Sequence, residues 1–290
     1  MDERAAADRL SDGMTIAIGG FINSGHPMAM VRQIIRRRLR GVTLVGAASA
    51  GLEMDMLLAA GCVGKLITPY VGAEGLASIG PAFRKLAQDG ELDLFELDEA
   101  LFYAGLRAAA QCLPFNPWRA GVGTAYPTLN PALREFNDPI SNERLLAVPA
   151  IDIDVTILHA GVADPYGNVQ HAGTGFGDRS LSAAADSTIV TVEQVISNEQ
   201  VRRAPAATSV TGVDAIVRAP FGAHPFASEG HYLPDAEHIR LYVQAATDWL
   251  RNNARGQLDE YLGRYVLEPQ DHMEYLERVG LRRLLSLSEF

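Results

Sequence analysis

Short apolar runs and amphipathic segments alternate along most of this 290-residue chain. The runs MTIAIGG, VTLVGA and KLITPYV have the length and the β-branched content of buried strands. The segments from Pro27 to Arg40 and from Ile79 to Gly90 instead have apolar residues at helical spacing. Glycine or proline marks each change. This alternation predicts an α/β fold, a mostly parallel sheet flanked by helices.

The second half of the chain continues the pattern after one interruption. Residues 98–113 predict a helix that ends before Pro114, and residues 116–144 contain four prolines and little periodicity, so we expect an irregular excursion there. Strand patterns return over 145–162, 187–196 and 213–221, and the pattern from Pro234 onward is helical. We find no internal repeat or linker. We therefore interpret residues 1–290 as a single domain, with an irregular excursion near 116–144 and a helical C-terminal extension near 234–290.

Composition narrows the classes of function. A net charge of −10 opposes non-specific nucleic-acid binding, and no apolar run approaches the roughly 20 residues of a membrane-spanning helix. The N-terminal residues MDERAAADRL are too polar for a signal peptide. Cys62 and Cys112 stand in apolar surroundings without disulfide or zinc spacing, so we interpret both as buried thiols. We expect a cytoplasmic protein with no metal site and with neither nucleic acid nor membrane as a partner.

The stretch DGMTIAIGGFINSGHP, residues 12–27, is the strongest candidate for a binding loop. A strand that ends at Gly19 and Gly20, a loop to Gly25 and a helix near Pro27 can present backbone N–H groups to phosphate. A tight strand-to-helix turn without a ligand is the alternative. The spacing matches neither a dinucleotide-binding GxGxxG nor a P-loop.

The same sixteen residues resemble the signature of the family I coenzyme A transferases. Asp12-Gly13, the apolar residues 16–18, Gly19-Gly20-Phe21, Gly25 and Pro27 all fall at its constrained positions. The segments DPYGNV, TIVTVEQVISNEQVRR and VDAIVRAPFGAHP and the tail PQDHMEYLERVGLRRLLSL resemble α subunits of the glutaconate type. The resemblance implies the NagB/RpiA/CoA transferase-like fold. It also implies that the acyl-CoA is contacted by these residues: Gly19, Gly20, Phe21, Ile22, Asn23, Ser24 and Gly25.

Family resemblance also implies a mechanism that uses a glutamate of a β subunit. That carboxylate attacks the thioester, and CoA then moves to a second carboxylic acid. This chain lacks a complete Ser-Glu-Asn-Gly type motif; its nearest match is Ser228-Glu229-Gly230, which we interpret as a surface loop, with catalysis as the alternative. We therefore expect a β-subunit partner, an α2β2 or comparable assembly, and no cofactor besides the CoA thioester substrate.

A second resemblance leads to Glu99. The segment LDEALFYAGLRAAAQCLPFNPWRAGVGT resembles the α subunit of the ring-opening acyl-CoA hydrolase of steroid degradation. In that family the glutamate of the Asp-Glu pair is catalytic, which implies that Glu99 acts as a base here. Alternatively, Asp98 and Glu99 only complement the helix dipole, an effect of ~0.3–1 kcal/mol. A non-catalytic effector-binding module is a further alternative, although the dozen residues ahead of the first strand are too few for a helix-turn-helix.

Other polar residues are weaker candidates for the functional site. His26 stands inside the signature at an unconstrained position, where it could touch CoA phosphates. We interpret His159 and His224 as structural histidines, with a place in the cleft as the alternative. Ser49 and Glu74 follow predicted strands, where open α/β sheets place ligands. GTGFGD, residues 173–178, resembles a phosphate loop only superficially.

Overall fold

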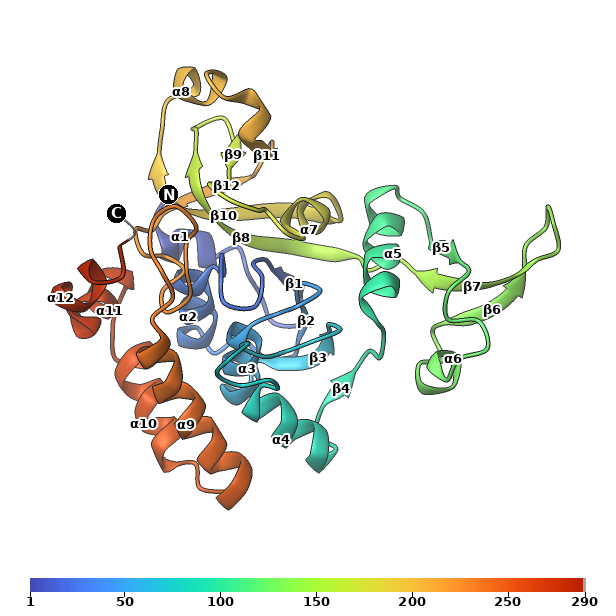
Figure 1. Cartoon of the computed structure of the whole chain (residues 1–290), viewed down its shortest axis with the longest axis horizontal. Coiled ribbons are helices and arrows are strands. Elements are labelled where there is room, and N and C mark those ends of the chain that lie inside the picture. Colours follow the sequence, from blue (N-terminus) through green and yellow to red (C-terminus); the bar gives the residue numbers. More distant parts are fainter. Residues whose placement is uncertain (289–290) are drawn as a thin grey trace.

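A large sheet runs through the middle of the molecule (Figure 1). The computed structural model describes residues 1–288. Strands β1, β2, β3 and β4 lie side by side in chain order, and β8, β10 and β12 continue the sheet beyond β1, all of them parallel. Two short antiparallel strands, β9 and β11, extend from the end of β8. The bounds are β1 Thr15–Ile18, β2 Val42–Val45, β3 Val63–Ile67, β4 Asp93–Leu94, β8 Ile153–Ala163, β9 Val169–Gln170, β10 Ala185–Val195, β11 Thr208–Val210 and β12 Ala215–Arg218.

Helices cover both faces of this sheet, as the alternating pattern predicts. Ile16 and Ile18 of β1 are buried in one core with helices α1 to α3, α9 and α10, while Ala17 between them belongs to a second core with α5 and α7. The fold class is thereby confirmed. The bounds are α1 Glu3–Ala7, α2 Met28–Arg36, α3 Leu52–Ala59, α4 Pro81–Asp89, α5 Glu99–Ala110, α7 Asp178–Ala183, α8 Asn198–Arg202, α9 Ala236–Asn252 and α10 Gly256–Leu262.

The segment near 116–144 is better ordered than the sequence pattern predicts. It forms a small antiparallel sheet from β5 (Phe115–Trp118), β6 (Arg134–Asn137) and β7 (Arg144–Pro149), with a short helix α6 (Tyr126–Leu129). The expectation of an irregular segment is corrected for these short elements, because prolines are tolerated on edge strands such as β5, while the rest of 116–144 lies in turns and loops. Figure 1 shows this small sheet projecting from the body beyond α5.

The same region corrects the interpretation of one cysteine. Cys112 is exposed, directly after α5, whereas Cys62 is buried as expected. Apolar neighbours in the sequence do not show which way the last turn of a helix faces.

The C-terminal extension is helical, as predicted, within the described residues. It contains α9, α10, a π-helical turn at Gly263–Leu267, α11 (His272–Val279) and α12 (Leu281–Leu285). Buried Arg32 of α2 joins it to the body: the guanidinium stacks 3.6 Å from the centroid of the Tyr275 ring and donates to the His224 carbonyl. No helix among residues 1–288 has the length and apolar character needed to cross a membrane.

Candidate active site

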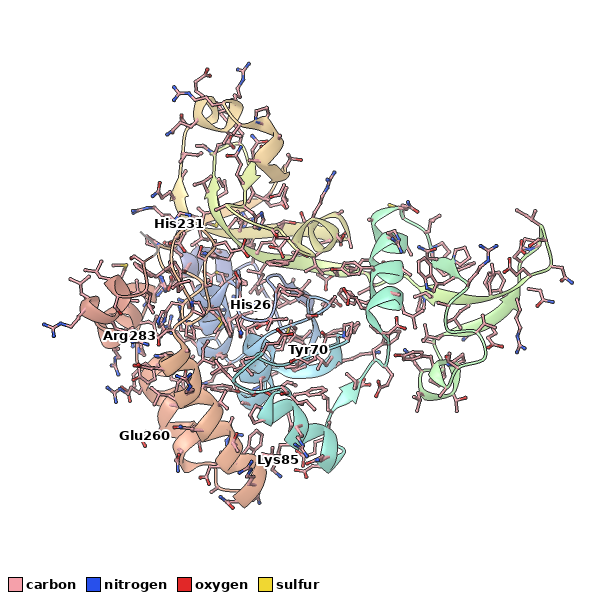
Figure 2. The ribbon with its side chains drawn as sticks, viewed as in Figure 1. His26, Tyr70, Lys85, His231, Glu260 and Arg283 are labelled. Atoms are coloured by element: carbon pink, nitrogen blue, oxygen red, sulfur yellow. The ribbon has the colours of Figure 1, made fainter. Side chains whose placement is uncertain are left out.

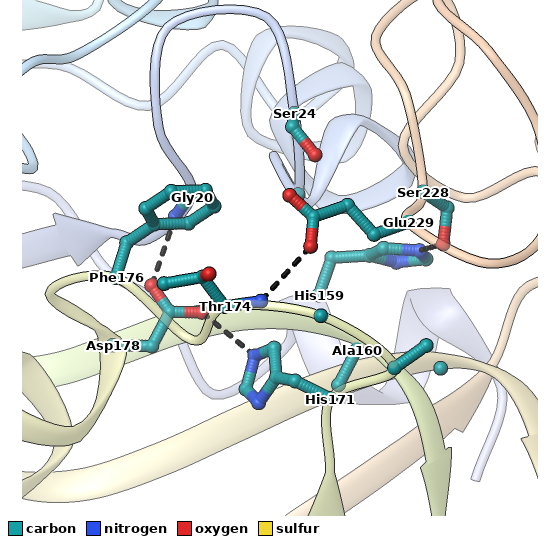
Figure 3. A pocket seen from close by; sticks show the side chains of 14 residues that line it. Gly20, Ser24, His159, Ala160, His171, Thr174, Phe176, Asp178, Ser228 and Glu229 are labelled. Carbon is teal, nitrogen blue, oxygen red and sulfur yellow. Dashed lines mark hydrogen bonds and ion pairs between the residues drawn. The ribbon is translucent and has the colours of Figure 1, made fainter.

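A pocket opens at the carboxyl end of β1, where the order of the sheet changes direction. The chain places β2 to β4 on one side of β1 and β8, β10 and β12 on the other, so the loops after β1 and β8 diverge and leave a crevice. Figure 3 shows this pocket. Its lining comprises Gly20, Ser24 and Gly25, residues 159–161 of β8, residues 171–174 with Phe176 and Asp178, and Ser228 with Glu229.

The glycine loop therefore lines a pocket, but its amides are not arranged as the sequence led us to expect. The Gly20 N–H donates to Asp178 Oδ1 at 2.9 Å, the Ile22 N–H to the Ser49 carbonyl at 2.8 Å, and the Gly25 N–H to the Ala227 carbonyl at 2.9 Å. Phe21 and Ser24 exchange two further backbone bonds. Because these donors are already paired within the chain, the loop is not an open phosphate cradle; of its side chains, that of Ser24 lines the pocket.

His26 lies behind the loop and cannot reach a CoA phosphate. It is completely buried, and its Nδ1 and Nε2 atoms lie 3.0 Å from the Gly19 carbonyl oxygen and 3.1 Å from the Ile22 carbonyl oxygen. Figure 2 places His26 at the centre of the molecule. The expected contact of this side chain with phosphate is wrong, since both ring nitrogens are used by the backbone.

The segment GTGFGD, residues 173–178, forms the wall of the pocket that faces the glycine loop. Its sequence resembles a phosphate loop only superficially. The Phe176 ring stacks on the Phe21 ring, with centroids 4.5 Å apart and planes 9° apart. Buried Asp178 accepts from Gly20, as described, and its Oδ2 lies 3.1 Å from His171 Nε2. This wall thus supports the glycine loop from the side (Figure 3).

A buried polar network forms the floor beside β8. His159 Nε2 lies 2.9 Å from Glu193 Oε1 and 3.3 Å from Ser228 Oγ, and Glu193 also accepts from the Tyr232 hydroxyl. Burial acts to raise the pKa of Glu193, but the bonds from His159, the Phe221 amide and Tyr232 lower it below its ordinary value. Glu193 is therefore an ionised, fully bonded anchor. His159 is structural, as interpreted, and also lines the pocket.

Glu229 is not a solvated loop residue. It is half-buried and lines the pocket, and its Oε2 accepts the Thr174 N–H at 2.9 Å (Figure 3). The bond joins the loop after β12 to the facing wall. Its place in the pocket corrects the surface-loop interpretation.

Glu99 lies at the edge of this arrangement rather than in the lining. It is exposed in the first turn of α5, and Asp98 caps that helix by accepting the Leu101 N–H at 2.8 Å. Tyr103 lies one turn further along α5. Burial, followed by the charges of Glu99 and Asp178, raises the pKa of its hydroxyl, so Tyr103 interacts electrostatically with both Glu99 and the pocket residue Asp178. Asp98 and Glu99 thus both stand at the N-terminus of α5, as the helix-dipole alternative expects, and catalysis by Glu99 stays a prediction.

The remaining candidates contribute through their backbone or lie elsewhere. The Ser49 carbonyl accepts from Ile22, and the Glu74 carbonyl accepts from the Asn23 side chain at 3.1 Å, so both loops support the glycine loop. His224 is completely buried and outside the pocket; its Nδ1 lies 2.7 Å from the Tyr275 hydroxyl and its Nε2 lies 3.2 Å from Asp235. His224 is structural, as interpreted.

The residues that line the pocket are mostly small or polar, and few of them can carry a positive charge. The lining combines two carboxylates, Asp178 and Glu229, with two imidazoles and the hydroxyls of Ser24, Thr174 and Ser228, and it contains neither lysine nor arginine. Such a pocket can orient a thioester carbonyl and accept protons. It offers no fixed positive charge for a phosphate or a second carboxylate.

Comparisons with known proteins agree with this architecture. The family model described as coenzyme A transferase matches residues 1–219. The A-type chain of glutaconate CoA-transferase from Acidaminococcus fermentans is 32% identical over 301 residues, covering 98% of this chain and 92% of that protein. The cholesterol ring-cleaving hydrolase IpdA subunit of Rhodococcus jostii is 33% identical over 252 residues, covering 83% and 84%.

Two further matches bear on length and fold. An uncharacterized protein of Archaeoglobus fulgidus is 35% identical over 99% of this chain, which spans 65% of that relative. The crystal structure of the A. fermentans glutaconate coenzyme A-transferase superposes with a TM-score of 0.91 at 31% identity, covering all of this chain and 95% of the other. The match extends beyond the family model into the C-terminal helices. With the family model over residues 1–219 and the full-length match to the A. fermentans enzyme, this chain belongs to the coenzyme A transferase family.

Proposed function

We propose that this chain is the α subunit of a heteromeric enzyme that moves CoA between an acyl-CoA and a carboxylic acid of the glutaconate type. Its partner is a β subunit of similar size, in an α2β2 assembly. The observation that carries the proposal is the pocket itself: the signature loop forms one wall, at the sheet position where α/β folds bind ligands. The full-length similarity to the A-type chain of glutaconate CoA-transferase supports the choice of reaction.

The reaction divides into steps that carboxylates can perform. A β-subunit glutamate attacks the thioester carbonyl, the C–S bond breaks, and a mixed anhydride and CoA thiolate result. The thiolate then attacks the glutamyl carbonyl, which releases the first acid and leaves a glutamyl-CoA thioester. The second carboxylic acid repeats these steps in reverse and leaves with CoA. No cofactor besides the CoA thioester is needed.

In this scheme the α chain contributes binding and orientation. Phe176, stacked on Phe21, supplies an apolar surface for the acyl-CoA, and Ser24 and Ser228 lie within the lining. Since the lining lacks lysine and arginine, cations for the CoA phosphates or a distal carboxylate come from the β subunit or from outside this pocket.

The test is reconstitution. The chain is produced alone and together with the β-type protein encoded beside it, and CoA transfer from an acyl-CoA donor to glutaconate is measured. We expect activity from the pair and none from the chain alone. Equal rates from both preparations would reject the requirement for a partner.

One observation favours a second candidate, the ring-opening acyl-CoA hydrolase. Glu99 is exposed, and it interacts electrostatically with Tyr103, whose hydroxyl lies close to the backbone at Gly177 beside the pocket. A base at this edge could act on an acyl group that extends out of the pocket. An effector-binding module without catalysis has no comparable observation in its favour.

A further inference from the structure

The strongest unassigned feature is the pair formed by His26 and Glu53 behind the glycine loop. The two carbonyl groups that face the His26 ring, those of Gly19 and Ile22, can only accept hydrogen bonds. Both ring nitrogens must therefore carry a hydrogen for both bonds to form. A neutral imidazole has one such hydrogen, so this geometry calls for the imidazolium form.

A counter-charge lies beside the ring. Glu53, from the first turn of α3, is completely buried, and its Oε2 lies 3.3 Å from His26 Nδ1. Its Oε1 accepts the Gly51 N–H at 2.9 Å, while Oε2 has no hydrogen-bond partner among the described residues. Burial raises the pKa of Glu53, and the charge of His26 and the backbone N–H groups oppose this rise. A buried charge of either sign requires such a partner.

The opposite proton arrangement fits the distances less well. If Glu53 carried the proton and His26 were neutral with its hydrogen on Nε2, the Nδ1 lone pair would face the Gly19 carbonyl oxygen at 3.0 Å. Two acceptors would then be in contact without a hydrogen between them, and one buried carbonyl would lose its bond. The contacts of the His26 ring with the Gly19 and Ile22 carbonyl groups therefore favour the imidazolium form of His26.

Two glycines leave room for the ring. A Cβ atom on Gly20 would lie 2.5 Å from His26 Nδ1, and one on Gly51 would lie 2.6 Å from His26 Nε2. The Phe226 ring meets the imidazole edge-on, with centroids 4.7 Å apart. The imidazole is thus enclosed by the loop that it supports, by the start of α3 and by the segment that leads to Ser228.

We propose that His26 carries a proton on both ring nitrogens and, paired with Glu53, is a positioning residue that holds residues 19–24 in the shape that lines the pocket. The ion pair fixes one wall before the ligand arrives, so that binding requires little ordering of the loop. The consequence for acyl-CoA rests on the proposed function; the protonation state does not.

Neutron diffraction from deuterium-exchanged crystals of the full-length chain near neutral pD tests the protonation directly. Deuterons on both Nδ1 and Nε2 of His26 are expected. A deuteron on a single ring nitrogen would overturn the proposal. This measurement needs neither a variant nor an active enzyme, and a wild-type complex that turned over no acyl-CoA would reject the proposed function alone.

Kinetics of the reconstituted enzyme test the positioning role. Glu53→Gln removes the counter-charge at nearly constant shape, and we expect KM for acyl-CoA to rise about tenfold while kcat stays within about threefold. The matched control is Asp55→Asn, a buried carboxylate on the same helix that bonds to α4 and Tyr242 rather than to the loop. This control is expected to lower Tm without raising KM. Equal increases in KM for the two variants would show a merely structural role and overturn the proposal.

Discussion

The main-chain amide of Gly20 donates a hydrogen bond of 2.9 Å to Asp178 Oδ1, across 158 positions of sequence. The same carboxylate reaches His171 through its other oxygen at 3.1 Å. One buried side chain thus joins the glycine loop after β1 to the wall that follows β9.

Asp178→Ala is expected to loosen the glycine loop. It leaves the Gly20 N–H and the Nε2 atom of His171 without their partner, which should cost ~1–3 kcal/mol of folding stability. Acyl-CoA affinity should fall by more than this loss of stability explains. Calorimetric titration of the complex with acyl-CoA and thermal unfolding measure the two effects. Asp154→Ala is the control: it removes a carboxylate bond to the Thr15 N–H at the opposite end of β1 and should leave affinity unchanged.

Gly20→Ala should lower the free energy of unfolding more than Gly13→Ala does. Gly20 has φ +100° and no space for a Cβ, whereas Gly13 has φ +76° and nothing within 4 Å of the position that a Cβ would take. Gly13→Ala therefore measures backbone strain alone, and Gly20→Ala should cost ~1–3 kcal/mol more because its Cβ would overlap His26 and the backbone of Ser24 and Gly25. Denaturant unfolding compares them. Equal losses would show that the space behind the loop is not limiting.

Glu99→Gln separates the two enzymatic mechanisms. In a ring-opening hydrolase the substitution removes the base, so acyl-CoA still binds while turnover falls by ~10²–10⁴. In a transferase the β-subunit glutamate forms the covalent bond, and the loss should stay below about tenfold. We expect the smaller loss. Glu91→Gln, an exposed acid ahead of β4, is the control for surface charge.

Chemical trapping examines the same choice independently. With acyl-CoA present, hydroxylamine or borohydride should modify a glutamate of the β chain if the enzyme is a transferase. A complex that loses nearly all turnover on Glu99→Gln and gives no β-chain adduct would establish the hydrolase instead.

The C-terminal extension should make the stability of the protein depend on pH. Burial, and then the charge of Arg32, lower the pKa of His272 from 6.5 to about 3. Below pH 6.5 the unfolded chain binds a proton that the folded chain does not bind until about pH 3, so stability falls as pH decreases over this interval. His272→Gln should start less stable at pH 8 but lose less on acidification. Parallel Tm curves for the two proteins would contradict this.

Patterns within about ten residues made the main sheet and the helices predictable, because its buried strands are continuous apolar runs whereas helices have apolar residues at a spacing near 3.6. The signature loop was identified from its glycines and from its resemblance to a family signature. His171, Phe176, Asp178 and Glu229 were missed or discounted because local spacing does not encode the strand pairing that brings them together. That pairing joins β1 to β8, β8 to β9 and β10, and β10 to β12. The one signal that could have helped is the cluster of glycines at 173–177, where the backbone passes close to other side chains.

The internally bonded amides of the glycine loop change what its sequence signature means. A motif whose donors are already satisfied by Asp178, Ser49 and Ala227 indicates that the strand-to-helix junction can form; it carries little information about which acyl group is bound. We therefore expect substrate choice to depend on the unconstrained residues between the glycines, above all Ser24, and on the distant segments that line the same pocket. Two relatives can share every constrained position and still catalyse different reactions.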